Sequence, residues 1–176
     1  MSNLKLIHGS CADQTADVVV NATNSGLWEG DGICGVIFRK CGSKELAQEC
    51  SKFQTPVKDG NTVITSACNM KNAKYIIHAV GPDFRITPTA FHELFNAYYN
   101  SLVLLKDNNL HSISFPLISS GIFAGNLSNP AGESAKQCGR SYKKFVKDYP
   151  DYEIVVMLCA FKSNEFQDAQ SALSTL

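Results

Sequence analysis

Short apolar runs of strand length recur along the chain and alternate with longer segments of helical character. Six runs are predicted to form strands: residues 4–7, 18–22, 62–67, 75–80, 112–117 and 154–159. Several of them are apolar at every position rather than at alternate positions, as is typical of strands that are covered on both faces. The pattern therefore indicates a sheet buried between two layers of helices.

Helical segments lie between these runs. In residues 87–106 the large apolar side chains follow a three-four spacing, and residues 130–147 repeat the pattern. Asn129 is a good N-cap for the second of these helices, with Pro130 at its first position. Further helices are expected over 33–40, 44–52 and 165–173. The alternation predicts an α/β domain with a mixed, mostly parallel sheet, in which ligands bind beyond the carboxyl ends of the strands.

The length and charge of the chain narrow its function class. A chain of 176 residues, 44% of them hydrophobic, is about the size of one domain, so we expect a single domain over 1–176. The formal net charge is zero, which argues against binding to duplex nucleic acid or to an acidic membrane surface. The chain has no long apolar run, and "MSNLKLIHGS" does not resemble a signal peptide. We expect a cytoplasmic protein, and a monomer because no heptad pattern is visible.

Seven cysteines are spread along the chain without a C-x-x-C pair. Their odd number argues against a disulfide framework, and their spacing argues against a zinc site. Most lie in apolar runs such as "MLCAF", so we expect most of them to be small buried hydrophobic residues. No metal site is predicted.

A glycine-rich loop follows the second predicted strand. Gly30, Gly32 and Gly35 have the G-x-G-x-x-G spacing of a dinucleotide fingerprint, but nine residues, 21–29, precede them where the fingerprint has almost none. No acidic residue is well placed about twenty positions further on, so a hydride-transfer enzyme is disfavoured. Glycines still allow backbone N–H groups to approach an anion, and "ICGVIFRK" begins a helix at the same place. The loop therefore predicts a phosphate site.

A second loop follows the fifth predicted strand and has a similar composition. In "ISSGIFAGN" the residues Gly121 and Gly125 free backbone amides, and Ser119 and Ser120 supply hydroxyls. Phe123 is an aromatic residue among small ones, which suits a stacking or ribose-covering group. Two glycine loops, each after a strand, suit a diphosphate held from two sides.

These features together resemble the macrodomain family of ADP-ribose-binding modules. The resemblance lies in three motifs in the family's order and spacing: "VVNATNSGLWEGDGICGVIFRKCG", "YIIHAVGPDF" and "ISFPLISSGIFAG". It covers essentially the whole chain. It implies a three-layer α/β/α sandwich around a central mixed sheet, in agreement with the pattern of predicted elements.

The resemblance assigns roles to the two loops. One loop would line the distal ribose and the diphosphate, and the other would wrap the phosphates, with its aromatic residue against the distal ribose. The residues are Gly30, Asp31, Gly32, Ile33, Cys34 and Gly35 in the first, and Ser119, Ser120, Gly121, Ile122 and Phe123 in the second. Asn24 matches an asparagine that binds the distal ribose in hydrolytic members, although "ATNSG" equally fits a turn-capping asparagine. Asn21 is a structural residue or a neighbour of the ribose.

The adenine end departs from the family pattern. Family members carry an aspartate that accepts a hydrogen bond from the adenine amino group, whereas this chain has Ser10, followed by Cys11. Either Ser10 or a backbone group takes over this role, or Asp13 swings in. Phe161 stands where the family keeps an aromatic residue on the adenine, and a core position is the alternative. His78 lies on an apolar strand and is expected to be a core histidine rather than a general base.

Cys34 is the second departure, because efficient mono-ADP-ribosyl hydrolases often have an aspartate at that place. Packing against the phosphates is the plainer role for Cys34, and a nucleophilic thiol near a helix N-terminus is the alternative. The resemblance implies hydrolysis of an ester between the distal ribose of ADP-ribose and a protein carboxylate or an acetyl group, with Asn24 as the catalytic residue and no cofactor. The alternative is a reader module that binds ADP-ribose or an ADP-ribosylated protein without turnover.

Overall fold

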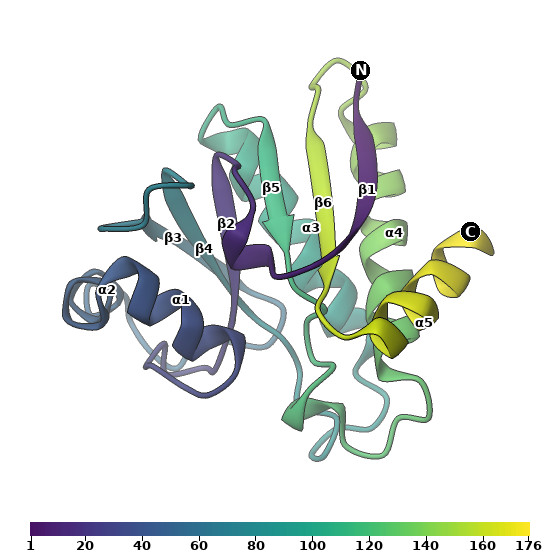
Figure 1. The fold of residues 1–176 in the computed structure, drawn as a ribbon, viewed down its shortest axis with the longest axis horizontal. Coiled ribbons are helices and arrows are strands. Elements are labelled where there is room, and N and C mark those ends of the chain that lie inside the picture. The colour runs from purple at the N-terminus through teal and green to yellow at the C-terminus, as the bar shows by residue number, and fades with distance from the viewer.

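The six predicted strands pair into one sheet in the order β1-β6-β5-β2-β4-β3, in a computed structural model that describes all 176 residues (Figure 1). Every neighbouring pair is parallel except β3 and β4, so the prediction of a mixed, mostly parallel sheet is confirmed. The strands are β1 (Asn3–His8), β2 (Val18–Thr23), β3 (Thr62–Ser66), β4 (Tyr75–Val80), β5 (Ser112–Phe115) and β6 (Val155–Ala160). Strand β5 ends before Pro116, which has no N–H to continue the ladder.

Five α-helices occupy the predicted segments. They are α1 (Ile33–Cys41), α2 (Ser43–Cys50), α3 (Phe91–Asp107), α4 (Pro130–Asp148) and α5 (Ser163–Ser174). Helix α4 begins as predicted, because the Oδ1 of Asn129 accepts the N–H of Gly132 at 3.1 Å. Helix α3 begins at Phe91 rather than at residue 87, because Pro88 disfavours helical geometry at Thr87. Two short 3₁₀ turns, Cys11–Asp13 and Ile122–Ala124, were not predicted.

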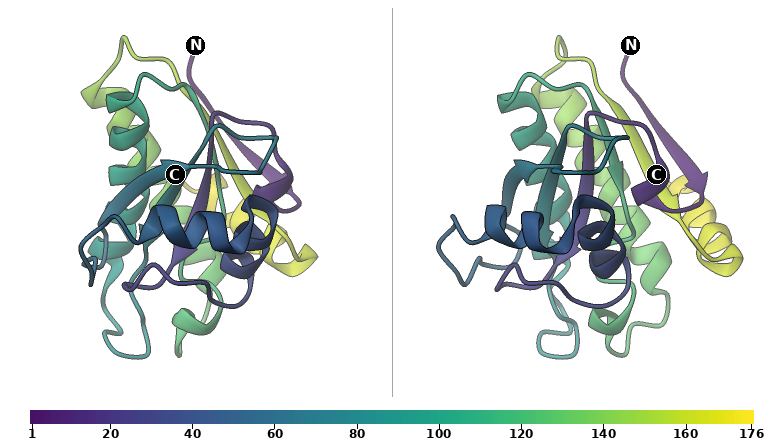
Figure 2. Two further views of the ribbon diagram at one scale, coloured as in Figure 1. Left: turned by 90° about the vertical axis from the view of Figure 1, so that its left-hand side faces the viewer. Right: turned by 60° about the vertical axis from the view of Figure 1, so that its left-hand side comes forward.

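The helices cover both faces of the sheet and make three layers (Figures 1 and 2). Along β2 the side chains of Val18 and Val20 join the apolar cluster that α3, α4 and α5 form on one face. Val19, between them, joins the cluster of α1 and α2 on the other face. This alternation explains why the strand is apolar at every position, and it confirms the three-layer α/β/α prediction.

The parallel strands end at one edge of the sheet, where the segments after β1, β2, β4, β5 and β6 come together (Figure 1). Residues that are far apart in the chain become neighbours there. This edge is where an open α/β sheet offers a ligand site. None of the five helices combines the length and the apolar character that a membrane crossing needs.

Six of the seven cysteines are buried, and Cys68 is partly exposed. This confirms that most of them serve as small hydrophobic core residues. Burial raises the pKa of the Cys159 thiol to about 11. No group of three or more His, Cys, Asp or Glu side chains is placed to hold a metal ion.

Candidate functional site

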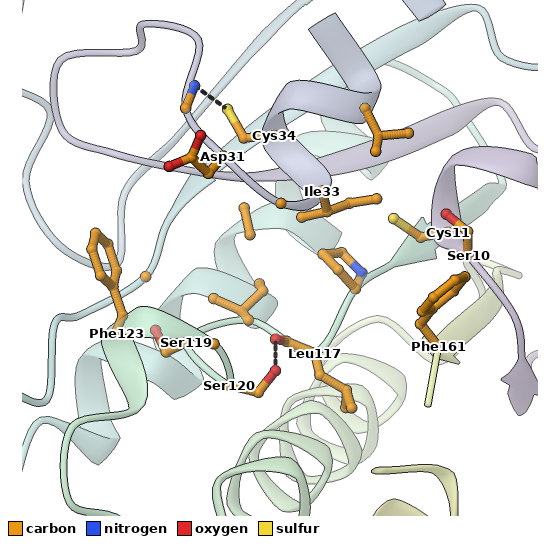
Figure 3. A pocket seen from close by; sticks show the side chains of 18 of the residues that line it. Ser10, Cys11, Asp31, Ile33, Cys34, Leu117, Ser119, Ser120, Phe123 and Phe161 are labelled. Carbon is orange, nitrogen blue, oxygen red and sulfur yellow. Dashed lines mark hydrogen bonds between the residues drawn. The ribbon is translucent and has the colours of Figure 1, made fainter. Parts of the chain in front are cut away.

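A pocket of about 810 Å³ lies at the carboxyl edge of the sheet (Figure 3). All five parallel strands contribute to it, either through their last residues or through the segments that follow them. The lining includes residues 9–11 after β1, 22–24 at the end of β2, Gly81 after β4, 116–123 after β5, and Cys159, Phe161, Lys162 and Glu165 around the end of β6. Residues 30–34, Val36 and Arg39 complete it. Such a volume suits a ligand of nucleotide size.

The first glycine loop presents unpaired backbone amides to this pocket. The N–H groups of residues 31–35 donate to no acceptor in the protein, since the first hydrogen bond of α1 runs from Val36 to Gly32. Gly32 has φ +63°, a conformation that suits glycine, and an added Cβ would meet no atom within 4 Å. The free amides and the positive end of the α1 dipole are features that favour an anion. Of the predicted residues of this loop, only Gly35 does not line the pocket.

Asn24 and Cys34 close this loop. The Oδ1 of Asn24 accepts the N–H of Trp28 at 3.2 Å, and its Nδ2 donates to the Trp28 carbonyl at 2.9 Å. The Sγ of Cys34 accepts the N–H of Gly30 at 3.4 Å (Figure 3). Asn24 thus has the turn-capping role while it also lines the pocket, so the two predicted roles are not exclusive. The Cys34 side chain is buried and braces the loop backbone, whereas its packing against phosphates stays a prediction.

The second glycine loop also presents backbone amides to the pocket, but its two serine hydroxyls donate hydrogen bonds to backbone carbonyls of the protein. The Ser119 Oγ donates to the Pro82 carbonyl at 2.7 Å, and the Ser120 Oγ donates to the Leu117 carbonyl at 2.7 Å (Figure 3). The hydroxyls that Ser119 and Ser120 were expected to supply are therefore already donated within the protein, although both residues line the pocket. The N–H groups of residues 119 and 121–123 donate to no protein acceptor, so this loop also offers free backbone donors.

The segment after β4 supports the second loop. The N–H of Phe84 donates to the Phe123 carbonyl at 2.8 Å, and a Cβ on Gly125 would come within 2.8 Å of the Phe84 backbone. A Cβ on Gly81 would lie 2.5 Å from the Ser119 Oγ. The glycine and proline of "HAVGPDF" had no predicted role. Gly81 leaves room for the side chains of Ile118 and Ser119, and the Pro82 carbonyl accepts the Ser119 hydroxyl.

The side chains that line the pocket carry no net charge. Two of them are acidic, Asp31 and Glu165, and two are basic, Arg39 and Lys162. The free amides of the two loops, and not a cationic surface, are therefore the feature of this pocket that would attract an anion. Arg39, Lys162 and Glu165 were not predicted to line the site, because nothing in their local sequence marks them.

Aromatic rings stand at the two ends of the pocket: Phe123 at one and Phe161 at the other (Figure 3). Phe161 is 72% exposed, so its alternative as a core residue is wrong. The guanidinium of Arg85 lies over the Phe123 ring, 5.6 Å from its centroid. Trp28 is also exposed, but it lies outside the pocket lining and covers Gly26.

Ser10 and Cys11 lie at the Phe161 end (Figure 3). The Ser10 Oγ accepts the N–H of Ala12 at 3.3 Å, and the Cys11 thiol donates to the Val20 carbonyl at 3.7 Å. Asp13 pairs with Lys40 at 3.1 Å and does not line the pocket, so the suggestion that it swings in is wrong. These contacts leave Ser10 as a lining residue whose hydroxyl already caps a turn.

Asn21 does not line the pocket, so its prediction as a ligand-binding residue is wrong. Its side chain is fully buried, and its Nδ2 lies 3.1 Å from the Nδ1 of His78. The Nε2 of His78 lies 3.0 Å from the Thr65 Oγ1. Burial lowers the pKa of His78 to about 4, so the ring is neutral and acts as a hydrogen-bonded core residue, as predicted.

Comparison with known proteins agrees with this geometry. The family model described as Macro domain matches residues 20–132, more than half of the chain. The chain belongs to the macrodomain family. The matched residues of this macrodomain include both glycine loops and the segment after β4 that supports them.

Similar proteins include enzymes that act on ADP-ribose compounds. The chain is 35% identical to the ADP-ribose glycohydrolase MACROD1 of Mus musculus, over 90% of this chain and 47% of that protein. It is 34% identical to the O-acetyl-ADP-ribose deacetylase of Salmonella typhimurium, over 90% of this chain and 87% of that one. Among solved structures, an Oceanobacillus iheyensis macrodomain with ADP superposes with a TM-score of 0.88 at 30% identity, covering 99% of this chain and 91% of that one.

Proposed function

We propose that this macrodomain binds ADP-ribose with its diphosphate between the two glycine loops. The observation that carries the proposal is that residues 31–34 and residues 119–123 line one pocket, and that the N–H groups of residues 31–34, 119 and 121–123 are unpaired. Two sets of N–H donors match a ligand with two adjacent phosphates. A nucleotide with a single phosphate would use only one of them.

The aromatic residues orient the ligand along the pocket. The adenine lies at the Phe161 end, where an exposed ring offers a stacking surface, and the distal ribose lies at the end lined by Phe123 and Asn24. The names of the similar proteins support this class of ligand, because they mention ADP, ADP-ribose and O-acetyl-ADP-ribose.

We further propose that the bound ligand is an ester of the distal ribose, formed with a protein carboxylate or an acetyl group, and that the protein hydrolyses it. Water adds to the carbonyl carbon of the ester, and the bond between that carbon and the ribose oxygen then breaks. The products are a carboxylic acid and a ribose with its free hydroxyl. Asn24 is held by Trp28 through one N–H and one oxygen lone pair, so a second N–H remains for the ribose. Fixed orientation of ester and water supplies the rate enhancement.

A reader module without turnover is the second candidate. Two observations favour it. The Asn24 amide is engaged with Trp28, and the Cys34 thiol braces the loop. The lining residues also include no buried carboxylate and no histidine that could act as a general base. Both candidates require the same ADP-ribose site, so binding and hydrolysis are tested separately.

Calorimetric titration with ADP-ribose, ADP, AMP and NAD tests the binding site. We expect ADP-ribose to bind most tightly and AMP to bind most weakly. Ile122→Glu places a negative charge beside the second set of amides on a side chain that is 67% exposed, and it should lower the affinity for ADP-ribose at least about tenfold. Tyr75→Glu is the control, since Tyr75 is an exposed hydrophobic residue, 39% exposed, outside this pocket and the smaller one beside Asn24.

Hydrolysis is tested with a glutamate-linked mono-ADP-ribosylated protein and with O-acetyl-ADP-ribose. We expect release of ADP-ribose from both, and a strong loss of release in Asn24→Ala beyond any loss of affinity. Complete retention of the label at high protein concentration, with ADP-ribose still bound in calorimetry, would leave the reader as the function.

A further inference from the structure

Glu165 is the only carboxylate that lines the Phe161 end of the pocket. It lies in the first turn of α5, four residues after Phe161 in the sequence. The other lining carboxylate, Asp31, belongs to the first glycine loop, near Cys34 and away from Phe161 (Figure 3). A base that stacks on Phe161 would therefore have one carboxylate nearby, that of Glu165.

The carboxylate of Glu165 is anchored and still has acceptor capacity. Its Oε1 accepts the N–H of Lys162 at 3.3 Å, which holds the side chain back over the start of the helix, beside the pocket. Its second oxygen has no hydrogen-bond partner in the protein. The neighbouring polar groups are engaged differently, because Ser10 accepts the N–H of Ala12 and the Cys11 thiol donates to Val20.

A carboxylate only accepts hydrogen bonds, so it selects among purines by what their edges offer. Adenine presents an exocyclic amino group, which is a donor, whereas hypoxanthine presents a carbonyl oxygen at the same position. A carboxylate beside the amino group makes a charge-assisted hydrogen bond, while a carbonyl oxygen there repels it. The anchored acceptor thus distinguishes two bases of the same size.

We propose that Glu165 determines the base specificity of this pocket by accepting a hydrogen bond from the amino group of a 6-aminopurine. The proposal rests on the proposed function, because it requires a nucleotide whose base lies at the Phe161 end. It assigns selectivity to the first turn of α5 rather than to Ser10 in the segment after β1.

The test is calorimetric titration with ADP-ribose and with its inosine counterpart, in which hypoxanthine replaces adenine. The wild-type protein should prefer ADP-ribose by about tenfold, the usual effect of one hydrogen bond to a charged group. In Glu165→Gln the side-chain amide can donate to the carbonyl of hypoxanthine, so the ratio of the two affinities should fall to about one or invert. Asp168→Asn removes a carboxylate from the same helix outside the pocket and should keep the wild-type ratio.

Three results would overturn the proposal. Glu165→Gln could keep the wild-type ratio, Ser10→Ala could abolish it, or the wild-type protein could bind both ligands equally. In each case ADP-ribose binding itself survives, and only the assignment to Glu165 fails. Absence of all binding by the folded wild-type protein is a different result, and it would overturn the proposed function together with this inference.

Discussion

The hydroxyl of Ser119 donates a hydrogen bond to the carbonyl of Pro82 across 2.7 Å. The two residues follow different strands, β5 and β4, and the bond joins the second glycine loop to the segment that supports it. Ser119 has φ +61°, a conformation that few non-glycine residues adopt. The loop is therefore held in a strained shape by a contact with a distant part of the chain.

Ser119→Ala should weaken both the fold and the binding of ADP-ribose. Loss of the bond leaves the Pro82 carbonyl without this donor and frees the loop, so we expect about 1–2 kcal/mol less stability and about fivefold weaker binding. Urea unfolding and calorimetry measure the two effects. Ser120→Ala is the control, because its hydroxyl donates only within its own loop, and its effects should be smaller. Equal effects of the two variants would contradict the bracing role of Ser119.

Gly125→Ala should destabilise the protein by about 2 kcal/mol or more, because φ is +58° and the added Cβ would lie 2.8 Å from the Phe84 backbone. Gly9→Ala is the matched variant in the segment after β1. Its Cβ would make ordinary contacts at 3.8 Å, so a change within about 0.5 kcal/mol is expected. The free energy of unfolding in urea checks both values, and a Gly125 variant as stable as the wild type would refute the close approach of the two loops.

Cys34→Ala should retain hydrolysis of the glutamate-linked substrate to within about threefold, because the thiol braces Gly30 and is not required as a nucleophile. Initial rates of ADP-ribose release measure this, with calorimetry as the control for affinity. Abolished turnover with unchanged affinity for ADP-ribose would instead identify Cys34 as the nucleophile.

Phe161→Ala should lower the affinity for ADP-ribose by about tenfold, the usual effect of removing an aromatic ring that stacks on a base. Stability should change little because the side chain is 72% exposed. Trp28→Ala removes a ring of similar exposure, 65%, that lies outside the pocket, and should leave affinity unchanged. The opposite ranking of the two variants in calorimetry would place the base elsewhere.

His78 should make the folded state less stable in acid. Burial lowers its pKa from 6.5 to about 4, so the unfolded chain takes up a proton at a higher pH than the folded protein does. Its contribution is fully present above pH 6.5 and is lost as the pH falls from there towards about 4, up to about 3 kcal/mol. Urea unfolding between pH 7 and about 4.5 measures the slope. His78→Asn should show a smaller decrease over this range; an unchanged slope would assign it to other groups.

Local chemistry in the sequence was enough to predict much of this protein. Short apolar runs predicted all six strands, and several of these runs are apolar throughout because their strands are covered on both faces. Asn129 and Pro130 predicted the start of α4, because capping and the fixed φ of proline act over a single turn. The glycines of both loops indicated backbone anion sites for a similarly local reason.

The tertiary structure decided where the side chains of the site point and which of them meet. Asn21 and Asn24 are three residues apart, yet one is buried against His78 and the other lines the pocket. The direction of the Ser119 hydroxyl depends on Pro82, and the position of Glu165 beside Phe161 depends on where α5 starts after β6. These outcomes depend on the order of strands in the sheet and on contacts between distant segments. Residue spacing along the chain encodes neither, because packing selects among several arrangements that the same local pattern allows.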